Sequence, residues 1–228
     1  MAKRKREPLS AERIEQAAIE LIEQDGLDGF SFRKLAARLH CEAMSIYHYF
    51  PSKAHLMDAV FNRVLSELAD PDPDLAWRQR LRQALLDYRA MAHRYPRLFQ
   101  YIALHRHNTR PGLSALQRLL DLVGEPGFDT ETIARYFRVI SYYLMGAALD
   151  ETSGYAKGPS AAEPVPEGEV ARDFPAVAAV NPYFRPTEHQ RTFDFGLDIL
   201  LDHLEGAAEE ARGKKPGPRD RPPRLASG

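Results

Sequence analysis

Apolar residues recur at helical spacing along most of the chain. In the first such segment, between Ser10 and Gly26, they fall at positions i, i+3, i+4, i+7 and i+8. No segment alternates between apolar and polar residues as a half-buried strand would. The pattern therefore predicts an all-α protein. Further apolar stripes predict helices over residues 52–68, 75–94, 96–107, 113–123, 130–152 and 187–208.

Two shorter helices follow the first one. Ser31 caps a helix that ends near Leu39, and after a three-residue break a second helix runs from Ala43 to about Tyr49. This second helix is shorter than the roughly 12–15 residues that an isolated helix needs in water, so its neighbours must hold it in place. Two short helices joined by a tight turn, the second with a polar outer face, predict a helix-turn-helix unit that binds DNA.

The aromatic run that ends the second short helix allows two interpretations. Such runs usually pack in a core, and we expect that role for Tyr49 and Phe50. For Tyr47, His48 and Lys53 we favour contact with DNA phosphates. A phenol, an imidazole and an ammonium group can all donate hydrogen bonds to phosphate oxygens.

The start of the second short helix is the candidate for base reading, and Arg33 in the preceding helix could reach a guanine edge. Before the first helix, residues 3–6 form a basic arm. This arm is either a solvated tail or a positively charged segment that lies along the DNA phosphates or enters the minor groove. The predicted DNA contacts are Arg33, Glu42, Ala43, Met44, Ser45, Tyr47, His48 and Lys53.

The run Tyr47-His48-Tyr49-Phe50-Pro51-Ser52-Lys53, preceded by Ser45-Ile46, resembles the DNA-binding signature of the tetracycline-repressor (TetR) family. The resemblance covers about residues 10–55. It implies a transcriptional regulator in which the first residues of the helix that bears Arg33 touch DNA. It also implies a homodimer joined through a four-helix bundle of the last helices. We therefore expect residues 1–53 to bind DNA, with residues 52–68 as a connecting helix.

A weaker likeness lies further along the chain. Thr109-Arg110-Pro111, Gly127-Phe128 and the run from Leu144 to Glu151 are similar to the ligand-binding domain of the tetracycline repressors. This likeness implies a drug site to which Asp150 contributes the acidic group. The family's magnesium-binding histidine falls at Arg106 by count, and a guanidinium does not ligate a metal. We therefore predict a small-molecule site without metal or cofactor, lined by Phe99, His107, Tyr143 and Asp150.

Composition marks the joints between these parts. The alternating aspartates and prolines of residues 70–74 separate the DNA-binding part from a helical ligand-binding and dimerisation domain at 74–208. The proline-rich segment 154–186 predicts a long, partly disordered loop, in which residues 174–184 are apolar enough to dock on the body. Residues 212–228 form a basic, proline-rich tail that we expect to be disordered.

The helices predicted at 130–152 and 187–208 carry more apolar residues than one buried face needs. Tyr136, Tyr142 and Leu149, for example, lie beside the main stripe of the first of them. Burial within the monomer would explain this excess, and so would a dimer interface. We favour the interface, because helix-turn-helix proteins gain affinity by placing two copies on adjacent half-sites.

Length and composition limit the function classes. The chain has 228 residues, 44% of them hydrophobic, which suits one or two domains with a core. A net charge of −1 argues against a protein that coats nucleic acid non-specifically. Any DNA binding must therefore be confined to one part of the surface. No apolar run reaches the roughly 18 residues of a membrane span, and no signal peptide is visible. The single cysteine, Cys41, fits a reducing cytoplasm.

These observations predict a ligand-released, homodimeric repressor that binds a palindromic operator. The alternative is a helical small-molecule-binding or scaffolding protein that has lost DNA binding. An enzyme is disfavoured, because the sequence contains no glycine-rich phosphate loop, nucleophile elbow or paired-carboxylate signature. His105 and His107 would point to different faces of a helix, which is poor spacing for a shared metal ion.

Overall fold

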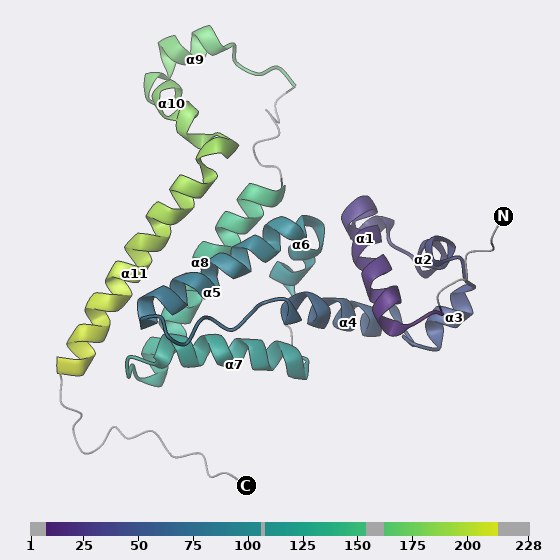
Figure 1. Ribbon diagram of the computed structural model, residues 1–228. Coiled ribbons are helices and arrows are strands. Elements are labelled where there is room, and N and C mark those ends of the chain that lie inside the picture. Colours follow the sequence, from purple (N-terminus) through teal and green to yellow (C-terminus); the bar gives the residue numbers. More distant parts are fainter. Residues whose placement is uncertain (1–7, 106–107, 154–161, 214–228) are drawn as a thin grey trace.

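The computed structural model describes residues 8–105, 108–153 and 162–213, and every regular element within these ranges is a helix (Figure 1). The predicted all-α fold is therefore confirmed. None of the helices in these ranges combines the length and apolarity that crossing a membrane requires. The basic arm at residues 3–6, the predicted ligand contact His107 and the tail from residue 214 onward lie outside the described residues.

Four helices form the N-terminal part of the molecule, with serine caps at three of them. The Ser31 hydroxyl, for example, accepts a hydrogen bond from the backbone N–H of Lys34 at 3.3 Å. Gly26 has a φ of 76°, so the first helix leaves helical geometry where its end was predicted. The elements are α1 (Ala11–Gly29), α2 (Phe32–Leu39), α3 (Ala43–Tyr47) and α4 (Lys53–Ser66).

The turn between α2 and α3 centres on His40, which adopts the left-handed conformation with φ 52° and ψ 44°. The backbone N–H of His40 donates to the carbonyl of Ala37, and that of Cys41 donates to the carbonyl of Ala36. These hydrogen bonds end α2. A residue with a Cβ atom is strained in this conformation by about 1–2 kcal/mol, because Cβ crowds the neighbouring carbonyl oxygen.

Replacing His40 by glycine should raise the free energy of unfolding by about 0.5–1 kcal/mol, since glycine relieves the crowding but loses more backbone entropy on folding. The His40 side chain is exposed. Urea denaturation of both proteins at one concentration measures the difference. His40→Ala is the matched control, because alanine removes the imidazole and keeps Cβ. An alanine variant that gains as much as the glycine variant would contradict this explanation.

The C-terminal body packs four helices around one apolar core, to which α5, α7, α8 and α11 contribute Leu85, Val123, Leu144 and Leu197. Helix α7 begins three residues before its predicted start at Leu113. The Thr109 hydroxyl accepts a hydrogen bond from the backbone of Gly112 at 3.2 Å, and a proline suits the first turn of a helix. The elements are α5 (Trp77–Arg94), α6 (Pro96–Leu104), α7 (Arg110–Gly124), α8 (Thr130–Ser153) and α11 (His189–Gly213).

Helix α6 joins the two parts. Its residues Leu98, Phe99 and Ile102 are buried in the same core as the residues of α1 and α4. The side chain at its N-cap position makes no capping hydrogen bond. Instead, the Glu23 carboxylate of α1 accepts hydrogen bonds from the backbone N–H groups of Arg97 at 3.1 Å and Leu98 at 2.8 Å. A side chain of α1 therefore caps α6.

The segment before α11 differs from the predicted loop. Pro175, Pro182 and Pro186 lie in the first turns of three short helices, where a missing N–H leaves no hydrogen bond unmade. Residues 162–188, which we call the arm, project from the body (Figure 1). The prediction that residues 174–184 dock on the body of the same chain is wrong, since Phe174 and Phe184 are 51% and 68% exposed. The arm contains α9 (Glu167–Asp173), α10 (Pro175–Val180), η2 (Asn181–Phe184) and η3 (Pro186–Glu188).

Candidate DNA-reading unit and effector cavity

Helix α3 has only five residues, and contacts on both sides of it hold it in place. Ile46 is fully buried and Phe50 is 7% exposed, and both pack in the N-terminal core. Phe50 thus packs as predicted. The Tyr49 ring is 44% exposed, so the prediction that it packs in the core is wrong. Its hydroxyl donates a hydrogen bond to the carbonyl of Leu9 at 2.8 Å, which ties α3 to the segment before α1.

Most of the predicted DNA contacts lie on the surface around α3. Arg33, Glu42, Met44, Tyr47, His48 and Lys53 are exposed, and Ala43 and Ser45 are half-buried. The ring centroid of Tyr47 lies 4.7 Å from that of Phe32, so packing restrains the direction of its hydroxyl. Met44 is 63% exposed at the first turn of α3, where an apolar side chain could touch a thymine methyl.

The cations near α3 fall into two groups. Lys34 and Arg38 form ion pairs with carboxylates of α1, at 2.8 and 2.7 Å, and thereby hold α2 against α1. Arg33 has no ion-pair partner within the described part of the chain. The Lys53 ammonium lies 5.4 Å from the centre of the Phe30 ring, which restrains it while its side chain stays exposed. Arg33 and Lys53 are therefore the cations most available to DNA.

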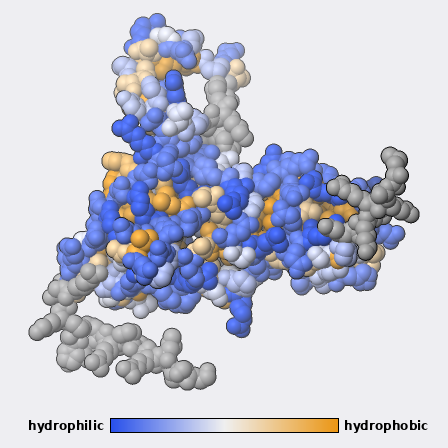
Figure 2. Space-filling view, in the orientation of Figure 1, coloured by the Kyte–Doolittle hydropathy of each residue, from blue (hydrophilic) through white to orange (hydrophobic). Residues whose placement is uncertain are grey.

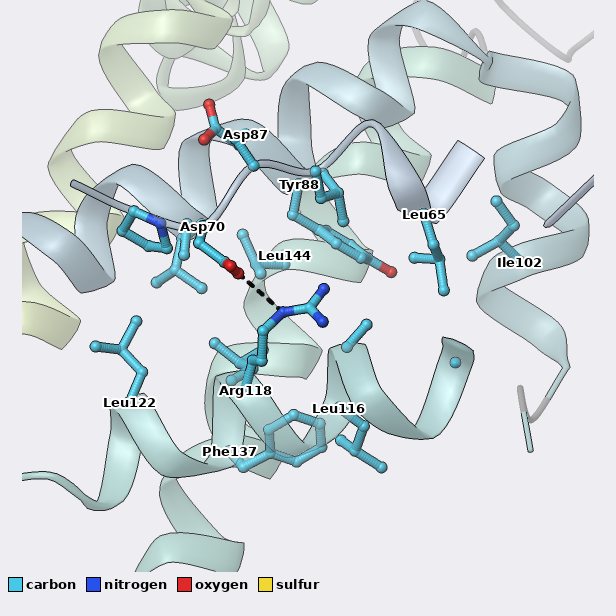
Figure 3. A pocket seen from close by; sticks show the side chains of 18 of the residues that line it. Leu65, Asp70, Asp87, Tyr88, Ile102, Leu116, Arg118, Leu122, Phe137 and Leu144 are labelled. Atoms are coloured by element: carbon cyan, nitrogen blue, oxygen red, sulfur yellow. Dashed lines mark ion pairs between the residues drawn. The ribbon is translucent and has the colours of Figure 1, made fainter. Parts of the chain in front are cut away.

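A cavity of about 280 Å³ lies in the body, and residues of α4, α5, α6, α7 and α8 line it (Figure 3). Its wall is mostly apolar, and Asp70, Asp87, Tyr88 and Arg118 are the lining residues with polar side chains. The Arg118 Nε lies 3.0 Å from a carboxylate oxygen of Asp70, and this ion pair spans one side of the cavity. Apolar lining residues include Phe61, Leu65, Ile102, Leu116, Phe137 and Leu144.

Within the described residues, the predicted ligand contacts Phe99, Tyr143 and Asp150 do not line this cavity. Phe99 is fully buried in the core shared by α1, α4 and α6. The Tyr143 hydroxyl donates to the carbonyl of Phe193 at 2.5 Å and so joins α8 to α11. Asp150 is exposed on α8, and His107 lies outside the described residues. The three described residues of that predicted site therefore lie in different environments.

Family models match the chain on both sides of the joint at residues 70–74. The model described as the tetracyclin repressor-like C-terminal domain matches residues 70–207, more than half of the chain. The model described as bacterial regulatory proteins of the tetR family matches residues 14–60, which include α2 and α3. The chain belongs to the tetR family. It is therefore a DNA-binding transcriptional regulator.

Individual tetR-family proteins resemble the chain over most of its length. It is 28% identical to the HTH-type transcriptional repressor DrrR1 of Streptomyces coeruleorubidus, over 90% of this chain and 81% of that protein. It is 29% identical to the class A tetracycline repressor protein from transposon 1721 of Escherichia coli, over 83% and 87% of the two chains. A possible TetR family transcriptional regulator from Streptomyces coelicolor A3(2) superposes with a TM-score of 0.71, at 26% identity, over 87% and 100%.

The polar residues that line the cavity were not predicted from the sequence of this tetR-family chain. Asp70 belongs to the predicted joint and Arg118 to a different helix, so only the fold brings them together. Tyr88 lies in the apolar stripe predicted for residues 75–94, and its hydroxyl was the one available signal, because a buried tyrosine hydroxyl usually has a partner. In the described ranges, no three His, Cys, Asp or Glu side chains are grouped so that they could hold a metal ion.

Proposed function

We propose that this tetR-family regulator is a cytoplasmic, homodimeric repressor that binds a palindromic operator and leaves it when a small molecule occupies the cavity. The observation that carries the proposal is the position of α4. This single helix begins at Lys53, beside the DNA-reading unit, and its residues Phe61 and Leu65 line the cavity. A ligand that displaces the wall at Phe61 therefore also displaces the helix that presents Lys53 to DNA.

A second connection supports the same coupling. Ile102 of α6 lines the cavity, and the first turn of α6 is capped by Glu23 of α1. Helix α1 in turn holds α2 through the ion pairs of Lys34 and Arg38. Both connections are chains of packed or hydrogen-bonded groups. A ligand shifts the equilibrium between the two arrangements only by its difference in affinity for them.

Exposed apolar side chains support the homodimer. Val139 and Tyr142 on α8 are 47% and 67% exposed, and Phe195 and Ile199 on α11 are 69% and 54% exposed. Apolar surface also lies on the arm and on the adjoining body (Figure 2). Large apolar areas of this kind mark contact surfaces, and a second copy of the chain would cover them. Two copies would present two α3 helices to half-sites about one helical turn of DNA apart, roughly 34 Å.

A reporter assay tests the proposal. The DNA upstream of the chain's own gene is placed before a reporter gene in a bacterial host, and the chain is supplied from a second promoter. We expect the chain to lower reporter expression and some members of a compound panel to restore it. Replacing Ala115, which lines the cavity, by leucine should keep repression. It should raise the required compound concentration by about tenfold or more, because overpacking a filled site costs about 1–3 kcal/mol.

Ser114→Leu is the matched control, because the neighbouring Ser114 is exposed, does not line the cavity and receives a side chain of the same size. This control should respond to compounds as the wild type does. Release of Ala115→Leu at unchanged compound concentrations would contradict the cavity as the effector site. A chain that binds the active compounds but never changes reporter expression would favour the alternative, a binding protein that has lost DNA recognition.

A further inference from the structure

The size and the wall of the cavity limit which molecules it can hold. Its volume of about 280 Å³ is roughly twice that of the 150 Å³ apolar cavity that accommodates a benzene molecule. Three of its lining residues, Phe61, Tyr88 and Phe137, are aromatic, and most of the others are aliphatic. Aromatic side chains prefer edge-to-face or offset contacts with other rings. The cavity therefore suits an aromatic molecule of about two fused rings.

The Tyr88 side chain places a hydroxyl group in the wall of the cavity. The Tyr88 ring meets the Phe99 ring edge-on, with the centroids 5.8 Å apart, and this contact fixes its orientation. The hydroxyl points across the cavity toward the side that Leu65 and Ile102 occupy (Figure 3). No side chain or backbone group among the described residues forms a hydrogen bond with it, and no side-chain oxygen of these residues is both fully buried and unpartnered, so the half-buried Tyr88 presents its hydroxyl to the open space of the cavity.

The Tyr88 hydroxyl is a donor at neutral pH. Burial raises the pKa of Tyr88 to about 12, so the group keeps its proton throughout the physiological range. A neutral phenol donates one hydrogen bond to an oxygen within reach. A ligand oxygen that reaches this side of the cavity can therefore accept a hydrogen bond from Tyr88.

The charged groups of the wall disfavour an anionic ligand. Arg118 is paired with Asp70, and Asp87 adds a second carboxylate, so the lining carries a net charge of −1. An anionic ligand would have to compete with Asp70 for Arg118 and would lie near Asp87. The two aspartates are the metal-type donors in the wall, and the ion pair already engages one of them.

We propose that the effector is an uncharged aromatic molecule of about two fused rings, with a hydroxyl or carbonyl oxygen at one edge that accepts a hydrogen bond from Tyr88. This inference rests on the proposed function of the cavity as the effector site. It assigns Tyr88 as the residue that distinguishes oxygen-bearing ligands from plain hydrocarbons of the same size.

Calorimetric titration of the full-length protein tests the assignment with three probes: 2-naphthol, naphthalene and 2-naphthoate. We expect 2-naphthol to bind most tightly. Tyr88→Phe should weaken 2-naphthol binding about five- to tenfold, the effect of one lost hydrogen bond, and leave naphthalene binding unchanged. The 2-naphthoate anion should bind at least about tenfold more weakly than 2-naphthol, because its charge must be desolvated beside Asp87.

Several outcomes would overturn the inference: equal losses for 2-naphthol and naphthalene in Tyr88→Phe, 2-naphthoate binding as tight as that of 2-naphthol, or no binding of any probe. Tyr88→Phe removes only an oxygen, so its thermal unfolding curve should match that of the wild type. A different result would contradict the proposed function without contradicting the ligand class. If 2-naphthol binds as expected but never shifts the affinity for operator DNA, the ligand class is supported and the role of the cavity in release is not.

Discussion

Replacing Arg89 by methionine should lower the free energy of unfolding by about 3–5 kcal/mol, because it leaves a buried carboxylate without its main partner. Arg89 is 8% exposed, and the Glu151 side chain is 5% exposed. The guanidinium donates to both carboxylate oxygens of Glu151, at 2.8 and 3.0 Å, and to the side-chain oxygen of Gln190 at 2.7 Å. These contacts join α5, α8 and α11. His93 also contacts Glu151, at 2.6 Å, but is too exposed to replace the guanidinium.

Arg94 offers the matched control on the same helix. It pairs with Glu67 at 2.8 Å, as Arg89 pairs with Glu151, but its side chain is 64% exposed. Arg94→Met should leave stability unchanged, since exposed pairs contribute little. The double variant Arg89→Met with Glu151→Leu should recover much of the lost stability, because no charge then stays buried. Guanidinium denaturation at one fixed protein concentration measures all four proteins. An Arg89→Met loss as small as that of Arg94→Met would contradict the role of this network.

Replacing Lys53 by alanine should weaken operator binding about 10- to 100-fold at moderate salt, because the proposed dimer would lose two phosphate contacts. The slope of log affinity against log salt should become shallower by about 1.8, since each neutralised phosphate contributes about 0.9. Lys53 is exposed at the first position of α4, so its removal leaves the core intact. Fluorescence anisotropy with a labelled operator fragment at several salt concentrations measures both quantities.

Tyr47→Phe separates hydrogen bonding from charge in the same assay. It removes the hydroxyl while the ring keeps its contact with Phe32. We expect a loss of about tenfold or more, because each protomer loses one hydrogen bond to an anionic phosphate, with no change in the salt slope because no positive charge is removed. Arg94→Met serves again as the control, since it removes a charge far from α3. Unchanged operator affinity in both Lys53→Ala and Tyr47→Phe would show that the residues around α3 do not contact DNA.

The N-terminal elements were predictable because they depend on local patterns. Ser10, Ser31 and Ser52 are caps, Gly26 breaks a helix, and Ile46 is the buried anchor of α3. Each of these features follows from the residue and its immediate neighbours, through capping, backbone freedom or hydrophobic spacing. The two family models then match residues on both sides of the predicted joint.

The arm and the cavity were not predictable in the same way. Pro175, Pro182 and Pro186 suggested a loop, whereas each occupies the first turn of a helix, a position that sequence alone does not distinguish from a break. The cavity depends on how five helices pack, so the sequence around Tyr88 indicated a hydroxyl that needs a partner but not that this hydroxyl faces a cavity. Phe99 was predicted to face a ligand, but it belongs to the core that α6 shares with α1 and α4.

Binding of the purified full-length protein to the DNA upstream of its own gene is the most direct test of a dimeric, sequence-specific regulator. We expect one near-palindromic fragment to bind two protomers tightly, and binding to weaken steeply between low and high salt. Scrambling one half of the palindrome should abolish most of the affinity, because both α3 helices must engage. Equal, weak binding to every upstream fragment, unaffected by scrambling, would contradict a dimer that recognises an operator there.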